Sequence, residues 1–134
     1  MPLYKYKDFK IYNMKKSIPK TVSIWAKTVS ERNPEKQTQL YSKNSVLLAT
    51  FQTLFLGHEG VTEYMISFLN KESIECQIID NYTHNDESGN FEVASGLYEF
   101  TYMQHGEKKV VKARYTFVIK NDLILSHHSS IQPS

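Results

Sequence analysis

A cation among apolar residues is the first feature of this sequence that could do chemistry. Arg114 is one of only two arginines in the 134 residues and lies in the middle of an apolar run. A guanidinium is costly to bury unless a carboxylate pairs with it. Glu99, expected on the neighbouring strand, is the natural partner. The pair either anchors the polar head of a ligand inside an apolar cavity or is a closed structural ion pair, and the sequence leaves both open.

Two adjacent histidines are the second candidate. His127 and His128 follow each other on an expected strand, so their side chains point to opposite faces. They therefore cannot serve one metal site, and we expect neither a bound metal nor another cofactor. His127 alone could act as a general base or as a hydrogen-bond donor to a ligand, or it could be a buried structural histidine.

Length, charge and composition limit the classes of protein that could use these residues. The chain is long enough for one domain, and 16 basic against 14 acidic residues give a net charge of +2. This balance excludes a strongly basic nucleic-acid binder. Apolar runs stay well short of the ~20 residues of a membrane span, and Cys76, the only cysteine, excludes an internal disulfide. We therefore expect a cytoplasmic protein with no nucleic-acid or membrane partner.

The first 16 residues differ from the rest because aromatic side chains alternate with lysines. Tyr4, Tyr6, Phe9 and Tyr12 could stack on the bases of single-stranded nucleic acid, with the lysines on its phosphates. The near-neutral charge favours the other interpretation, an arm that lays its aromatics on its own domain or on a partner subunit. We therefore divide the chain into a basic and aromatic arm, residues 1–16, and one domain, residues 17–134.

Three helices are expected in the first half of the domain. Residues 19–32 carry apolar side chains at the spacing of one helix face, and Trp25 is one of them. A short second helix begins at an Asn-Pro-Glu sequence and would carry Tyr41. Residues 57–69 repeat the apolar stripe, with Tyr64 on the buried face. The helices would thus each turn at least one aromatic side chain towards a common core.

The second half is expected to be a sheet. Runs of alternating or continuous apolar residues are separated by short polar segments, and a glycine marks the bend between the two longest runs. The expected strands cover residues 46–50, 74–80, 91–103, 108–120 and 123–129, with a polar loop at residues 82–90.

Both faces of the longest expected strand are largely apolar. Tyr115, Phe117 and Ile119 share one face, whereas Val110 and Val118 lie on the other. An antiparallel sheet with one solvated face should alternate cleanly between apolar and polar residues. Three helices in a chain of this length cover only one face. We therefore expect a second copy to cover the face with Tyr115, Phe117 and Ile119, in a homodimer or a larger homo-oligomer.

The order of elements and several local strings resemble the nuclear transport factor 2-like superfamily, which includes the SnoaL-like proteins. The most specific string, His127-His128-Ser129-Ser130 followed by Pro133, resembles the association domain of calcium/calmodulin-dependent protein kinase II and its small stand-alone bacterial relatives. The resemblance covers residues 20–134. It implies an α+β fold of the cystatin-like type, in which three N-terminal helices pack on a strongly bent antiparallel sheet to form a cone with a pocket inside.

The resemblance also implies which side chains face that pocket. Glu99 and Arg114 would share the inner face, and His127 and Ser129 would point inward as well, whereas His128 would face outward. Because Glu99 and Ser129 stand where the kinase association domain carries cavity arginines, its preference for small carboxylates does not transfer intact. The expected ligand-binding cavity is lined by Trp25, Tyr41, Tyr64, Glu99, Arg114, His127 and Ser129.

These observations predict a small association module that forms a homo-oligomer and binds a small carboxylate or apolar ligand, with no catalytic residue assigned. The alternative is an isomerase-like or cyclase-like enzyme that acts on a small apolar substrate with His127 or Glu99 as its base. An ion pair with Arg114 would lower the pKa of Glu99 and make it a poor base at neutral pH. The chain carries neither a Gly-rich loop nor an HRD or DFG string, so no kinase activity is expected.

Overall fold

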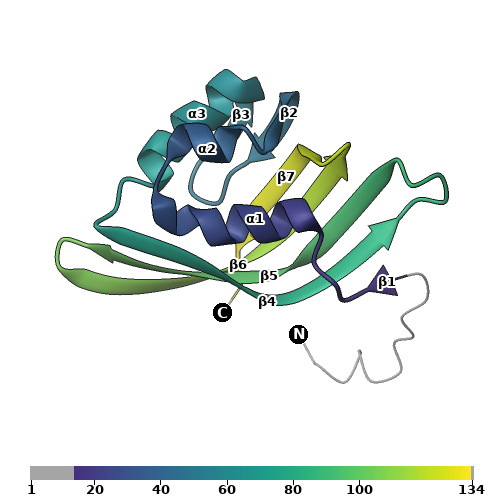
Figure 1. Ribbon diagram of the computed structural model, residues 1–134. Coiled ribbons are helices and arrows are strands. Elements are labelled where there is room, and N and C mark those ends of the chain that lie inside the picture. The colour runs from purple at the N-terminus through teal and green to yellow at the C-terminus, as the bar shows by residue number, and fades with distance from the viewer. Residues whose placement is uncertain (1–13, 134) are drawn as a thin grey trace.

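The helical half of the chain follows the predicted apolar stripes. In the computed structural model, which describes residues 14–133, helix α1 spans Lys20–Thr28 and continues into the short 3₁₀ turn η2, Val29–Glu31. Helix α3 spans Gly57–Phe68. Both helices lie on the same side of a bent sheet, which curls up around α1 (Figure 1). Residues 1–13 of the predicted arm lie outside the described residues.

Helix α2 is shorter than predicted and does not include Tyr41. It spans Pro34–Thr38, and the side chain of Asn33 caps it by accepting the N–H of Lys36 at 3.1 Å. Tyr41 is instead the first residue of strand β2, Tyr41–Leu48, because its backbone pairs with strand β7 opposite Ile124. Pairing with a distant strand thus prevails over local helix propensity.

The sheet of residues 14–133 has seven strands in the order β1-β4-β5-β6-β7-β2-β3. All neighbours are antiparallel except β2 and β7, which run parallel. The α+β architecture with a strongly bent, almost entirely antiparallel sheet is therefore confirmed. The strands other than β2 are β1 (Met14–Lys15), β3 (Leu54–Leu56), β4 (Ser73–Asn85), β5 (Phe91–Gln104), β6 (Glu107–Lys120) and β7 (Leu123–Ile131).

Strand β4 extends further than the polar composition of its second half suggested. Residues 82–85, predicted as part of a loop, continue the pairing with β5, and two of them, Thr83 and His84, also pair with β1. The side chains of Asn81 and Thr83 are buried, and both donate hydrogen bonds to the backbone oxygen of Ser17, at 3.2 and 2.9 Å. These polar residues are therefore retained in the strand because the N-terminal segment satisfies them.

A bulge in β4 produces the bend of the sheet. The register with β5 shifts between Ile78 and Asp80, which leaves one extra residue in β4. Gly96 of β5 lies directly beneath this bulge, and a Cβ there would collide with the backbone oxygen of Asp80. The hydroxyl of Tyr115 donates to that same oxygen at 3.2 Å and to Asn81 Oδ1 at 2.6 Å. A residue without a side chain is thus required where the sheet turns.

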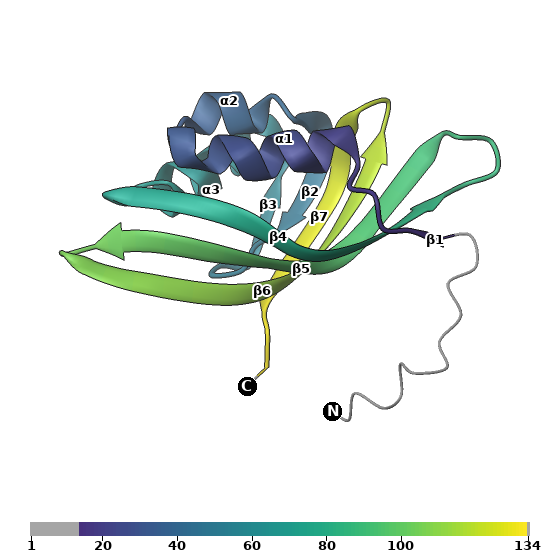
Figure 2. The same ribbon diagram turned by 60° about the horizontal axis from the view of Figure 1, so that its bottom comes forward.

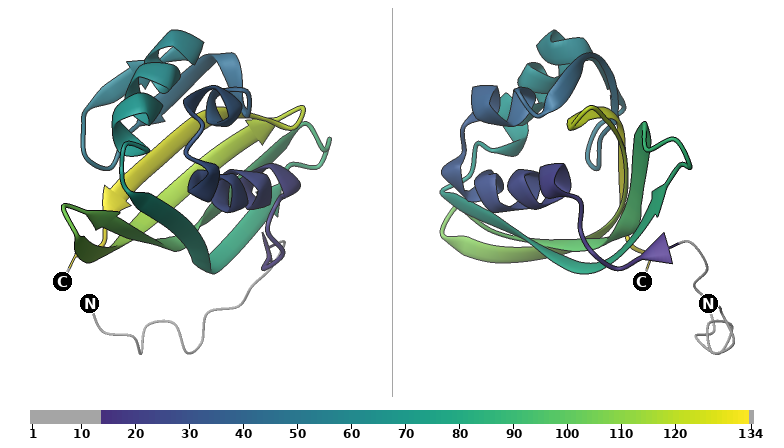
Figure 3. Two further views of the ribbon diagram at one scale, coloured as in Figure 1. Left: turned by 60° about the vertical axis from the view of Figure 1, so that its left-hand side comes forward. Right: turned by 45° about the vertical axis from the view of Figure 1, so that its right-hand side comes forward.

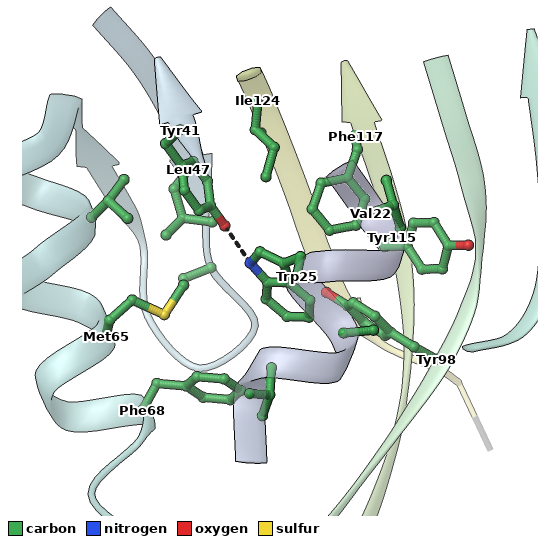
Figure 4. Packing of buried hydrophobic residues seen from close by; sticks show 14 of the residues in the cluster. Val22, Trp25, Tyr41, Leu47, Met65, Phe68, Tyr98, Tyr115, Phe117 and Ile124 are labelled. Carbon is green, nitrogen blue, oxygen red and sulfur yellow. Dashed lines mark hydrogen bonds between the residues drawn. The ribbon is translucent and has the colours of Figure 1, made fainter. Parts of the chain in front are cut away.

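The inner face of the sheet is the face that sequence reasoning assigned to a partner. Tyr115, Phe117 and Ile119 are buried, because the helices and not a second copy cover them. The ring of Trp25 in α1 lies 5.6 Å from that of Phe117, edge to face (Figure 4). The opposite face of β5 and β6 is turned away from all the helices (Figure 2). Within residues 14–133 no helix is long and apolar enough to cross a membrane.

Candidate functional site

A chain of hydrogen bonds runs through the aromatic core between α1 and the inner face of the sheet. Nε1 of Trp25 donates to the hydroxyl of Tyr41 at 3.0 Å (Figure 4). The same hydroxyl lies 2.7 Å from Nδ1 of His127, and the hydroxyl of Tyr98 lies 3.1 Å from Nε2 of that ring. Residues from α1, β2, β5 and β7 therefore meet at one buried imidazole.

The chain of hydrogen bonds continues towards Thr50, and its donors all point in the same direction along it. Tyr98 donates its hydroxyl proton to Ser129 Oγ at 2.5 Å, and Ser129 is hydrogen-bonded to the hydroxyl of Thr50. Because the Tyr98 proton is engaged there, its oxygen accepts from His127, which assigns the proton of the imidazole to Nε2. Nδ1 then accepts from Tyr41, whose oxygen accepts from Trp25. The network thus leads from the core to Thr50 in the segment between β2 and β3.

Packing fixes the imidazole between aromatic rings. His127 is 2% exposed and stacks on Phe117, its cross-strand neighbour in β6. Trp25 meets the imidazole edge to face at 5.3 Å. This enclosure, together with the charge of the adjacent His128, lowers the pKa of His127 to about 3, with burial as the larger cause. The imidazole is therefore neutral at physiological pH.

Burial also keeps the tyrosines of the network neutral. It raises the pKa of Tyr41 and of Tyr98 far above the ordinary value of a phenol, and that of Tyr64 as well. The site is thus an uncharged set of hydroxyl, indole and imidazole groups with aromatic walls. Within the described part of the chain, no group of His, Cys, Asp and Glu side chains is placed to hold a metal ion.

A small cavity adjoins the network inside the cone. Its volume is about 10 Å³, close to the least that one water molecule occupies. Trp25, Tyr64, Tyr98, His127 and Ser129 line it, together with other side chains of the core. The cone is therefore almost filled by its own side chains.

A second cavity of about 160 Å³ lies next to the first, and Tyr64 and Phe68 line both. Phe51, from the segment between β2 and β3, and Lys71, just after α3, also line this outer cavity. The ammonium of Lys71 lies 5.4 Å from the ring centre of Tyr102 and donates to the backbone oxygen of Phe68 at 3.1 Å. Partial burial lowers the pKa of Lys71. The outer cavity thus has a cationic side chain in its wall.

The structure brings together five of the seven residues that the sequence assigned to the cavity. Trp25, Tyr41, His127 and Ser129 belong to one hydrogen-bonded network, and Tyr64 lines the cavity beside it. Their role in binding a ligand remains a prediction.

The placement of Arg114 and Glu99 in the cavity was wrong. In the β5–β6 register Arg114 is opposite Leu97 and Glu99 is opposite Lys112, so both lie on the outer face of the sheet. Arg114 is exposed and its Nε donates to Ser130 Oγ at 3.2 Å, whereas Glu99 is half-buried. Neither lines the cavity, and no ion pair joins them within residues 14–133.

Sequence reasoning missed Tyr98 and Thr50 as members of the network. Tyr98 alternates with Phe100, and this spacing places both on one face of the strand, but it does not say that the phenol meets a histidine. Thr50 lies between two strands, where no periodicity applies. Tyr98 and Thr50 become recognisable only once β7 is known to pair with β6 and β2. This pairing places His127 and Ser129 beside them.

Comparisons with known proteins identify the fold. No protein-family model matches the chain, and no curated protein matches it in sequence. Among solved structures, one described as a calcium/calmodulin dependent protein kinase II association domain, from Xanthomonas campestris, is 27% identical with a TM-score of 0.78, and the match covers 93% of this chain and 99% of that chain.

Two further structures are more distant in sequence. A nuclear transport factor 2-like superfamily protein from Salmonella enterica is 16% identical with a TM-score of 0.74, over 85% of this chain and 87% of that chain. A protein described as a dehydratase of the same family, from Streptomyces avermitilis, is 12% identical with a TM-score of 0.74, over 85% of this chain and 93% of that chain. The likeness of these two extends to the fold alone.

Proposed function

Because the chain has the nuclear transport factor 2-like fold, we propose that it is a small association module that forms a homo-oligomer and binds a small ligand in its cone. The single observation that supports the formation of a homo-oligomer is the outer face of the sheet. Among residues 14–133 the helices lie on the inner face only, and none of them covers the outer face of β5, β6 and β7 (Figure 3).

The composition of this outer face favours a partner. Leu97, Met103, Val110 and Val118 lie on it, and Val110 is 51% exposed. It continues across β7 onto β2 and β3, where leucine side chains are 39 to 61% exposed. These apolar side chains share the face with polar ones, which include Ser126, His128 and Ser130 of β7, and such a mixed composition is typical of non-obligate interfaces. The 27% identical protein that is described as an association domain supports the same proposal.

Light scattering after gel filtration tests the association. We expect at least twice the monomer mass for the unaltered chain, and a monomer for Val118→Lys, because a lysine there puts a charge into the apolar face. Ile66→Lys is the matched control, since Ile66 is 59% exposed on α3, away from the sheet. If the unaltered chain is a monomer at micromolar concentration, the proposed association is wrong.

The proposed ligand binding rests on two neighbouring cavities, the inner one of about 10 Å³ and the outer one of about 160 Å³. Aromatic walls, hydroxyl groups in the inner cavity and Lys71 in the outer cavity suit a small, mainly apolar molecule with one polar or anionic group. Because the inner cavity has room for about one water, such a ligand needs the segment between β2 and β3 to move.

The single tryptophan of the chain gives a direct test of ligand binding, because Trp25 lines the inner cavity. Benzoate and benzyl alcohol, which share a ring but differ in charge, should both change its fluorescence on entry. Lys71→Met should weaken the binding of benzoate and leave that of benzyl alcohol unchanged. If neither probe alters the emission up to its solubility limit, the cone does not bind such ligands.

An isomerase or cyclase that uses Glu99 or His127 as its base has less support. Glu99 lies on the outer face, away from the cavity. Both ring nitrogens of His127 are hydrogen-bonded, and its pKa of about 3 leaves it a weak base. The arrangement therefore favours binding over proton transfer.

A further inference from the structure

One hydroxyl hydrogen at the end of the buried network has no acceptor within residues 14–133. Tyr98 donates to Ser129 Oγ at 2.5 Å, and Ser129 is hydrogen-bonded to the hydroxyl of Thr50. Ser129 and Thr50 carry two hydroxyl hydrogens between them, and the bond that joins them uses one. Neither hydroxyl donates to any other group of the described residues. Whichever of the two donates to the other, one hydrogen of this pair therefore remains for another molecule.

Both hydroxyls of this pair belong to residues that line the inner cavity. The donors of the network point from Trp25 towards Thr50. In this direction Ser129 donates to Thr50, and the hydrogen that remains is that of Thr50. The next residue after Thr50, Phe51, lines the outer cavity. Thr50 therefore offers a hydrogen-bond donor to a molecule that extends from the outer cavity into the inner one.

The inner cavity is uncharged. The residues that line it include no Lys, Arg, Asp or Glu. Burial lowers the pKa of His127 to about 3 and raises the pKa of Tyr64 and of Tyr98 far above the ordinary value, so that all three are neutral at physiological pH. An ionised carboxylate would lose its hydration in this cavity without gaining a cation, which is costly. The occupant that suits the donor is therefore a neutral hydrogen-bond acceptor.

A carbonyl oxygen meets these conditions. It accepts hydrogen bonds and brings no hydrogen of its own, whereas an alcohol adds an O–H that needs a further acceptor. One oxygen atom takes about the place of one water molecule, for which the inner cavity has room. The rest of such a ligand fits the outer cavity of about 160 Å³, which shares Tyr64 and Phe68 with the inner one.

We propose that the hydroxyl of Thr50 donates a hydrogen bond to the carbonyl oxygen of a small neutral ligand, such as a cyclic ketone, and that this bond selects carbonyl compounds for the cone. The inference rests on the proposed binding of a small ligand and deepens it by naming the ligand class. Lys71 acts on an anionic group in the outer cavity, so the selection by Thr50 concerns only the end of the ligand that enters the inner cavity.

Cyclohexanone and methylenecyclohexane are a matched pair of probes, because they differ only in the oxygen that replaces a methylene group. Trp25 is the only tryptophan and lines the inner cavity, so the NMR shift of its indole N–H reports the binding of each probe. Thr50→Val should weaken the binding of cyclohexanone relative to methylenecyclohexane by roughly three- to tenfold, the effect of one neutral hydrogen bond. The ratio of the two dissociation constants is compared because easier access to the cavity affects both probes alike.

Thr50→Ser is the matched control, since serine keeps the hydroxyl and should keep the ratio of the unaltered chain. In Thr50→Val a methyl group takes the place of the hydroxyl beside Ser129 and separates Ser129 from the ligand. If both probes bind and Thr50→Val leaves the ratio unchanged, or if Thr50→Ser shifts it as much, the bond from Thr50 is wrong while ligand binding in the cone stands. If neither probe moves the indole signal up to its solubility limit, the proposed ligand binding and the bond from Thr50 are both wrong.

Discussion

The imidazole of His127 lies face to face with the ring of Phe117, with 3.9 Å between the ring centres and 18° between the planes. The two residues are direct partners in the β6–β7 register. An uncharged imidazole stacks well on a phenyl ring in this dry environment, whereas a charged one would lose its hydration without gaining an anion. The stack therefore belongs to the neutral state of the histidine.

Acidification should destabilise the protein through this residue. The folded pKa of His127, about 3, is below the ordinary value of about 6.5 in an unfolded chain. Below about pH 6.5 the unfolded chain therefore binds a proton that the folded chain does not, and stability falls by roughly 1.4 kcal/mol per pH unit down to about pH 3. Urea unfolding at a series of pH values measures this slope.

His127→Gln is the comparison for the pH series, because glutamine can donate and accept but does not titrate. Its unfolding free energy should be lower at neutral pH and should depend less on pH than that of the unaltered chain. Parallel curves for the two proteins would mean that His127 is protonated in the folded state.

Removing the hydroxyl of Tyr41 should be costly. Tyr41→Phe leaves Nε1 of Trp25 and Nδ1 of His127 without their partner in a fully buried place. Each unsatisfied group costs about 1–3 kcal/mol, so the unfolding free energy should fall by that amount or more. Tyr82→Phe removes a hydroxyl that only accepts from exposed Lys16, and should change stability by less than about 0.5 kcal/mol. Equal losses in the two variants would contradict the buried network.

Thr50 should control access to the inner cavity. Thr50→Val keeps the shape of the side chain but removes its hydrogen bond to Ser129, the one side-chain bond from residues 49–53 to the rest of the described chain. Acrylamide should then quench the fluorescence of Trp25 more strongly. Thr53→Val, in the same segment, is the control and should leave quenching unchanged. If both variants quench like the unaltered chain, the Thr50 bond does not close the cone.

The bend of the sheet should depend on Gly96. Gly96→Ala places a methyl group against the backbone oxygen of Asp80 and within 2.8 Å of the Tyr115 hydroxyl. Because the obstacle is backbone in a packed bulge, we expect a loss of about 3 kcal/mol or more in thermal or urea unfolding. Ser95→Ala, next to it in β5, should cost about 1 kcal/mol at most, since its hydroxyl makes only a 3.3 Å contact with Thr116. A Gly96→Ala protein as stable as the control would disprove the tight bulge.

Local patterns were sufficient to predict most of the fold. The apolar stripe around Trp25, the Asn-Pro helix start and the long hairpin of β5 and β6 are each encoded within a few residues. The resemblance to the nuclear transport factor 2-like superfamily is confirmed by the solved structures. What failed depends on distant pairing: Tyr41 joins β7, and residues 82–85 stay in β4 because β1 and Ser17 satisfy them.

The candidate site was only partly predictable because both sheet faces are apolar. Alternation correctly separated Arg114 from Tyr115 and Phe117, but it could not tell which of the two faces meets the helices. The register supplies the missing fact, since Phe117 opposite His127 puts both on one face. A prediction that places His127 inside and Phe117 outside is thus geometrically inconsistent, and the rare arginine belongs with the solvent-facing set.

The parallel pairing of β2 with β7 has a consequence for the order of events during protein synthesis. β2 leaves the ribosome before most of this sheet exists, whereas β7 follows all the other strands of the sheet in the chain. Until then β2 is paired with β3 on one side only, and its other edge is open to other nascent chains. The sheet is therefore completed only after translation of β7, so the N-terminal half waits for a partner strand that is encoded about 80 residues later.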